Sequence, residues 1–188
     1  MEGISKPSPL RLAGFLATAG GGLLVALGSL QAWIAVGLKS DTTDSLTTTS
    51  PGIDFRAGKV TLALGVIAIL AIAALRLVRS LNARRAIAVV VLLAGLAAAG
   101  IGLRELTGDR NRFLSAGVHA LAQQLHDQIG LPLNDALAQK VRDQLRVEGF
   151  VEFKVGLYLV VAGGVVVAAG GLLDLAWVGR RRLEAEGV

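Results

Sequence analysis

The side chains best suited to chemistry in this 188-residue chain include a pair of histidines in its longest polar segment. His119 and His126 are seven residues apart, with Gln123 between them and Asp127 alongside, so the four polar groups share one side of a helix. Imidazole and carboxylate groups bind metals, but two histidines supply too few of the four ligands of a structural zinc site. We therefore expect a solvated polar face here, and no metal site.

A single acid, Asp174, lies inside the apolar run from Val155 to Val178, close to the end of that run. An acidic residue within a membrane segment is a functional candidate by default. A proton or ion relay needs further polar groups in the middle of the membrane, and the apolar runs supply none. The favoured interpretation is an ion pair with Arg11, and Arg76 and Arg79 are alternative partners.

Other features that support catalysis or cofactor binding are missing from the sequence. The chain has no cysteine, which excludes a thiol nucleophile, a disulfide and a cysteine metal site. The Gly20-Gly21-Gly22 triplet lies inside an apolar run and follows no predicted strand, so it favours helix packing over phosphate binding. Because no acid, base and nucleophile converge, we expect no enzyme, no catalytic residue and no cofactor.

The composition is that of a membrane protein, with 53% hydrophobic and only 18% charged residues and a mean hydropathy of +0.62. The net charge of +5 comes from arginines that cluster beside apolar runs, where membrane topology needs them, so nucleic acid is not an expected partner. We predict an all-α membrane protein, a four-transmembrane-helix bundle forming one domain over 1–188. Its spans lie at about 10–36, 58–78, 86–103 and 155–178.

The first span is a retained helix in this interpretation. Lys6 and Arg11 give it the basic start of a signal peptide, and Leu30-Gln31-Ala32 resembles a cleavage site. The apolar run is nevertheless longer than the roughly 7–15 residues usual in a signal peptide. The last span, about 24 residues at about 1.5 Å each, is roughly 36 Å long, enough to cross a bilayer core of roughly 30 Å.

Both of these spans carry glycines at intervals of seven residues, which keeps them on one side of a helix. Small residues let membrane helices approach closely. If the first and last spans are antiparallel, one register sets three pairs opposite each other, and it also brings Arg11 near Asp174. We predict helix packing through these pairs: Gly14 with Gly170, Gly21 with Gly163, and Gly28 with Gly156.

The two external loops, 39–57 and 104–154, are expected to form an extracytoplasmic cap. Strands at 33–36 and 46–49, with a turn at 41–44, would form a short β-hairpin, in which case the first span ends before Trp33. Apolar residues at helical spacing predict an amphipathic helical hairpin from 111 to 145, broken at Gly130-Leu131-Pro132. Asp54 is placed to cap the second span.

Aromatic and basic residues indicate how the chain sits in the membrane. Trp33, Tyr158 and Trp177 lie near span ends, where amphipathic rings anchor at the interface. Basic residues gather at both termini and between the second and third spans, all on one side. By the positive-inside rule that side is cytoplasmic, so we expect a multi-pass membrane protein with both termini inside.

Short motifs resemble those of a known group. Trp33-Ile34-Ala35-Val36, Gly52-Ile53-Asp54, the segment from Gly58 to Gly65 and Gly156-Leu157-Tyr158-Leu159 are similar to small uncharacterised four-span membrane proteins common in actinobacteria. The topology also resembles that of claudin-like tetraspan proteins, without the paired cysteines of their first loop. The resemblance implies a four-span bundle in a bacterial plasma membrane and no particular activity.

Two functions fit these features. The first is a non-enzymatic integral membrane scaffold or accessory subunit, which contacts the lipid bilayer and binds other membrane protein subunits, or itself, through glycine-lined helix faces and the external cap. The alternative is a lipid or small-hydrophobe binding or transport protein. That function requires an apolar pocket of roughly several hundred Å3, which we would expect between bundle and cap.

Overall fold

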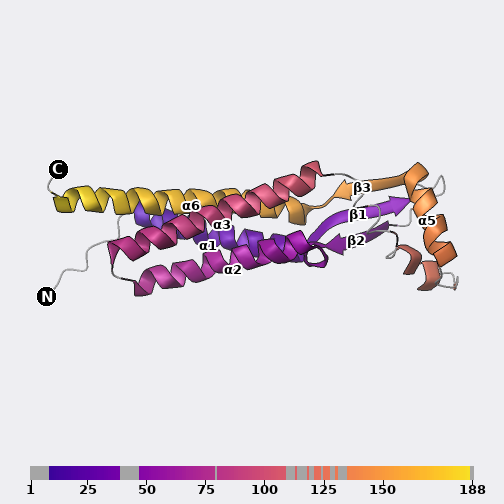
Figure 1. Cartoon of the computed structure of the whole chain (residues 1–188), viewed down its shortest axis with the longest axis horizontal. Coiled ribbons are helices and arrows are strands. Elements are labelled where there is room, and N and C mark those ends of the chain that lie inside the picture. The colour runs from indigo at the N-terminus through magenta and orange to yellow at the C-terminus, as the bar shows by residue number, and fades with distance from the viewer. Residues whose placement is uncertain are drawn as a thin grey trace.

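Four long helices run side by side and end in a small cap in the computed structural model of the chain (Figure 1). The structure describes residues 9–38, 47–78, 80–108, 113, 118, 121–123, 125–127, 130 and 135–186. All four helices are long and apolar enough to cross a membrane. They are α1 (Pro9–Leu30), α2 (Arg56–Leu77), α3 (Leu81–Thr107) and α6 (Val155–Glu186).

The helices form a ring in which each packs on two neighbours. α1 packs on α2 and α6, and α3 packs on the same two helices from the other side. Ser80 caps the start of α3, because its hydroxyl accepts the backbone N–H of Ala83 at 3.3 Å. The predicted four-helix membrane bundle is therefore confirmed, and its apolar surface faces outward all round, as lipid requires.

The cap contains a three-stranded antiparallel sheet. Its strands are β1 (Ala32–Leu38), β2 (Thr47–Pro51) and β3 (Gly149–Phe153), in the order β2-β1-β3. The first span was predicted too long, because α1 ends at Leu30 and β1 begins within the predicted range 10–36. The alternative prediction was a β-hairpin that ends the first span before Trp33, and β1 and β2 correspond to its two strands. Its predicted turn at 41–44 lies outside the described residues.

Strand β3 was not predicted, and it changes the cap from a hairpin to a sheet. Ile34 of β1 pairs with Phe153 of β3, while Ala35 of β1 pairs with Thr49 of β2 on the other side. β1 is therefore the central strand. An isolated two-stranded hairpin is marginal in water, and a third strand gives it a face to pack.

The helical part of the cap is represented by α5 (Asp135–Glu148), the second helix of the predicted hairpin. Most of the predicted first helix lies outside the described residues. Gly130 has φ +70° and its N–H donates to the carbonyl of His126 at 2.9 Å, which is how a glycine ends a helix. The predicted Asp54 cap is absent, because Phe55 is the N-cap of α2 and no side chain bonds there.

A buried apolar cluster joins the cap to the bundle. Its largest members are the aromatic rings of Trp33, Phe55, Phe113 and Phe153, in contact from one ring to the next. Trp33 and Phe55 stack at 6.2 Å, and Phe113 meets Phe55 and Phe153 edge to face, each at 5.9 Å. Leu157 of α6 is fully buried beneath these rings. The sheet and the helices thus share one core.

Candidate functional site

A seam of glycines holds α1 against α6. A Cβ atom built on Gly21 would lie 2.7 Å from the backbone nitrogen of Val167 and 2.8 Å from the carbonyl oxygen of Gly163. One built on Gly28 would lie 2.7 Å from the carbonyl oxygen of Gly156. Real Cβ atoms do not approach other atoms this closely, so the helix backbones are in contact with no room for a methyl group. The structure brings both glycine pairs together.

The third pair, Gly14 and Gly170, lies at a buried polar layer. A Cβ atom on Gly14 would lie 3.4 Å from the carbonyl oxygen of Gly170 and 2.7 Å from Oδ1 of Asp174. Asp174 is 7% exposed, and its Oδ2 and the hydroxyl of Thr18 have no hydrogen-bond partner among the described residues. The glycine at position 14 therefore makes the space that this carboxylate occupies against α1.

Arg11 and Asp174 do not form the direct ion pair that the sequence suggested, since their N and O atoms are not within 4.0 Å. The guanidinium carbon of Arg11 instead lies 5.4 Å from the ring centroid of Trp177. Arg11 and Arg84 both still interact electrostatically with Asp174. The reason is geometric: the short carboxylate packs on Gly14, while the long arginine extends over the indole.

Trp177 forms a platform for three cations from three helices. Arg11 of α1, Arg84 of α3 and Arg181 of α6 have guanidinium carbons 5.4, 5.5 and 5.6 Å from its ring centroid. Arg84 also donates from Nε to the carbonyl oxygen of Val78 at 3.0 Å, just after α2 ends. Cation–π contacts contribute about 0.5–1 kcal/mol each when exposed. We call this end of the bundle the basic end, and the opposite end the cap end.

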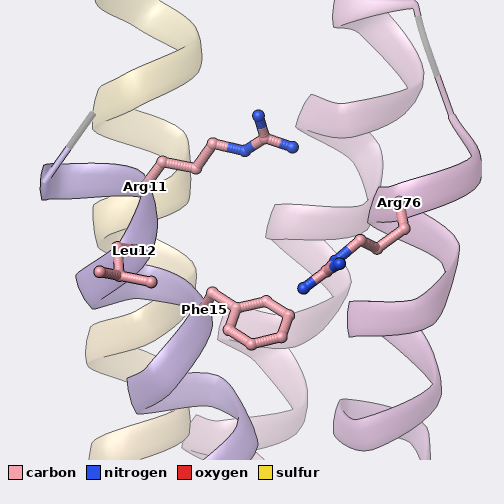
Figure 2. Close-up of a pocket in the computed structure, with 4 residues that line it drawn as sticks. All are labelled: Arg11, Leu12, Phe15 and Arg76. Atoms are coloured by element: carbon pink, nitrogen blue, oxygen red, sulfur yellow. The ribbon is translucent and has the colours of Figure 1, made fainter. Parts of the chain in front are cut away.

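A cavity of about 300 Å3 opens at the basic end, between α1 and α2. It is lined by Arg11, Leu12 and Phe15 of α1 and by Arg76 of α2. Figure 2 shows both guanidinium groups turned toward the space between the helices, and that of Arg76 lies 5.0 Å from the ring centroid of Phe15. A second cavity of about 280 Å3 lies at the same end, lined by Leu81, Asn82, Arg85, Leu175, Val178 and Gly179.

A model of one protein family, described as tryptophan-associated transmembrane protein, matches residues 15–186. The match includes nearly all of the bundle, the sheet and α5. The chain belongs to this family. No curated protein gives a significant match. The actinobacterial resemblance and the claudin-like topology stay expectations, because the family description carries neither.

The tryptophan expected at the membrane interface is buried in this family member. Trp33 is 1% exposed, and its Nε1–H donates to the carbonyl oxygen of Gly28 at 2.9 Å. Its ring packs on Phe55 and against the backbone of Gly52, so it meets protein and not lipid. This corrects the expectation for Trp33. Tyr158, by contrast, is 53% exposed on the first turns of α6, where an interface role stays a prediction.

One polar contact between α1 and α2 was missed in the sequence. The hydroxyls of Ser29 and Thr61 are 2.8 Å apart and fully buried. Ser29 also lies 2.8 Å from the carbonyl oxygen of Val25, and Thr61 lies 3.0 Å from that of Gly58. Two hydroxyl protons thus serve three short contacts. The signal for this bond was a serine and a threonine placed near the same ends of adjacent apolar runs.

The histidine pair gains no support as a metal site. His119 lies outside the described residues, and His126 lies in the short described helical stretch 125–127, next to Asp127. Among the residues that the structure describes, no group of three or more histidine, cysteine, aspartate or glutamate side chains could hold a metal ion. The structure instead brings guanidinium groups and aromatic rings together at the basic end.

Proposed function

We propose that this family member is a non-enzymatic membrane scaffold or accessory subunit that presents its cap to another protein. The supporting observation is the direct continuation of the α1–α6 pair into the sheet (Figure 1). Only Gln31 separates α1 from β1, and only Lys154 separates β3 from α6. The N–H of Lys154 donates to the carbonyl of Trp33 at 2.8 Å, which links the α1–β1 segment to the β3–α6 segment at this junction. The cap is thereby held firmly on the bundle.

The glycine faces support the cap as the partner surface. The glycines of the α1–α6 seam are already occupied by packing within the chain. The glycines between α3 and α6 are also occupied, because a Cβ atom on Gly95 would meet the backbone of Gly164 and Ala168. Among the described helix glycines, Gly20, Gly100 and Gly179 have no atom within 4 Å of a built Cβ, so these three are the ones that a second membrane protein could meet. A partner bound at the cap needs none of these faces.

The alternative function, a pocket for lipid between bundle and cap, gains less support. The junction is filled by the aromatic cluster and by Leu157 and Val160, which are fully buried. Both cavities described above lie at the basic end, far along the bundle from the cap. Binding of a small hydrophobe at the junction would require this cluster to open.

The proposed orientation sets the basic end in the cytoplasm of a bacterial cell and the cap outside it. All four helices carry arginines at the basic end, and by the positive-inside rule this supports a cytoplasmic location for that end. Because the chain has no cysteine, Thr49→Cys in the cap and Arg180→Cys at the basic end give single labelling sites without background. A membrane-impermeant maleimide added to intact spheroplasts should label position 49 and spare position 180. The reverse pattern would refute the orientation.

The partner proposal is tested by site-specific photo-crosslinking in the native membrane. A photoreactive amino acid is placed at Arg142 or Gln144, which are exposed on α5, and at Leu70, which is exposed on α2 within the membrane span. We expect one adduct of defined mass from both α5 positions and none of that mass from Leu70. Equal adducts from all three positions, or adducts of the chain with itself alone, would contradict a partner docked on the cap.

A further inference from the structure

We propose that the cavity between α1 and α2 at the basic end binds the phosphate group of an anionic phospholipid. This goes beyond the proposed scaffold function and does not depend on it. The two guanidinium groups that line the cavity come from different helices, Arg11 from α1 and Arg76 from α2 (Figure 2). A phosphate bound between them would connect the two helices at this end.

The donor chemistry fits a phosphate. Guanidinium is a planar, permanently charged group whose N–H donors match phosphate oxygens in pairs. None of the described residues that line the cavity is acidic. Arg76 lies over the face of the Phe15 ring, a contact that limits its motion and leaves the N–H groups at its edge free to donate. Arg11 interacts with Asp174 from the α6 side, so Arg76 carries the less compensated charge.

The surroundings of the cavity favour a lipid over free phosphate. Leu12, which lines it, is 50% exposed, and Leu16, one turn further into the bundle, is 59% exposed. Both lie on α1 at or beyond the cavity on its bilayer side, so a headgroup held by the arginines would leave its acyl chains beside exposed leucine. At about 300 Å3 the cavity is the size of a headgroup site, at the low end of the roughly 300–1,000 Å3 of ligand pockets.

Basic residues at a membrane surface attract anionic lipids in any case, by about 1 kcal/mol each. The proposal therefore needs a comparison between a cavity arginine and one elsewhere at the same end. Arg180 of α6 supplies it, because it is exposed and lines neither described cavity. Arg76→Gln and Arg180→Gln remove the same charge from the same end, and only the first empties one side of the cavity.

The test is native mass spectrometry of the full chain in neutral detergent, titrated with dioleoylphosphatidylglycerol, with dioleoylphosphatidylcholine, or with inorganic phosphate. We expect phosphatidylglycerol to bind in preference to phosphatidylcholine, and inorganic phosphate neither to bind measurably nor to displace it. Arg76→Gln should weaken phosphatidylglycerol binding about fivefold, and the double variant with Arg11→Gln about 25-fold. Neutral detergent carries no anionic surface, and salt screens a charge that lies outside the cavity, so Arg180→Gln should leave the affinity within about twofold of the parent.

Two further variants keep the test independent of folding. Arg76→Lys retains the charge and loses the fork of donors, so it should bind phosphatidylglycerol about two- to threefold more weakly than the parent. Phe15→Leu removes the aromatic support under Arg76 and should act in the same direction. Equal losses in Arg76→Gln and Arg180→Gln would overturn the site in favour of a general surface field. Displacement of the lipid by inorganic phosphate would overturn its assignment to a lipid.

Discussion

The glycine seam between α1 and α6 predicts a sharp difference between two neighbouring positions on one helix. Gly21 lies in the seam, and Gly20, the residue before it, has no atom within 4 Å of a built Cβ. Gly21→Ala and Gly20→Ala add the same methyl group to the same turn of α1. They share any gain in helix propensity, up to about 1 kcal/mol. The difference in unfolding free energy between the two variants therefore isolates the packing of α1 on α6.

The size of this difference follows from the distances. The built Cβ of Gly21 lies 2.7 Å from the backbone nitrogen of Val167, where ordinary contacts begin at 3.4 Å. Its second neighbour, the carbonyl oxygen of Gly163, is also backbone, so no side chain can turn aside and the helices must separate. Overpacking of this kind costs about 1–3 kcal/mol. We expect Gly21→Ala to be less stable than Gly20→Ala by that amount.

The assay is equilibrium unfolding in mixed micelles, with dodecyl sulfate as denaturant and helicity followed by circular dichroism. Gly163→Ala should resemble Gly21→Ala, because its built Cβ lies 2.8 Å from the carbonyl oxygen of Gly21. The double variant should lose less than the sum of the two, since one separation of the helices accommodates both methyl groups. If Gly21→Ala proved as stable as Gly20→Ala, the close approach of these helices would be refuted.

Three further outcomes are expected in the same assay. A double-mutant cycle of Ser29→Ala and Thr61→Val should give a coupling of about 0.6 kcal/mol, the average for hydrogen bonds between membrane helices, and additive losses would mean that the bond is not formed. Trp33→Phe should lower the free energy of unfolding by about 1–3 kcal/mol, because it leaves a buried carbonyl of α1 unpaired. An unchanged free energy would show that the Nε1 bond contributes nothing. Trp177→Leu should lower the free energy of unfolding by about 1–3 kcal/mol, because it removes the ring that three guanidinium groups contact. An unchanged free energy would refute that arrangement.

The bundle could be predicted because its signals are local. Each apolar run identifies a span by itself, and a seven-residue spacing sets glycines on one side of a helix without knowledge of the partner. The register that the sequence suggested for α1 and α6 needed only those spacings. The structure has Gly21 beside Gly163 and Gly28 beside Gly156.

The cap and the basic end depend on contacts between distant segments, and the sequence carries little sign of them. Gly149–Phe153 is too short to show a strand pattern, and it becomes β3 through pairing with β1, more than a hundred residues earlier. Position alone places Trp33 at the interface, whereas in the structure it stacks on Phe55 from another segment and is buried in the cluster that joins cap and bundle. The α1–α6 register predicted that Arg11 pairs with Asp174, whereas in the structure its guanidinium group lies over the ring of Trp177.

The central claim is that the bundle holds the cap in one orientation, and it is tested most directly by distances between spin labels in lipid nanodiscs. The cysteine-free chain accepts labels at Lys59 of α2 and Arg142 of α5, which are both exposed. A second pair, Lys59 and Leu103 of α3, lies within the bundle. Its distance distribution gives the width that the motion of the labels alone produces. We predict a single distribution between bundle and cap, as narrow as that of the second pair. A broad or bimodal distribution would contradict a firmly held cap, and with it the proposed scaffold.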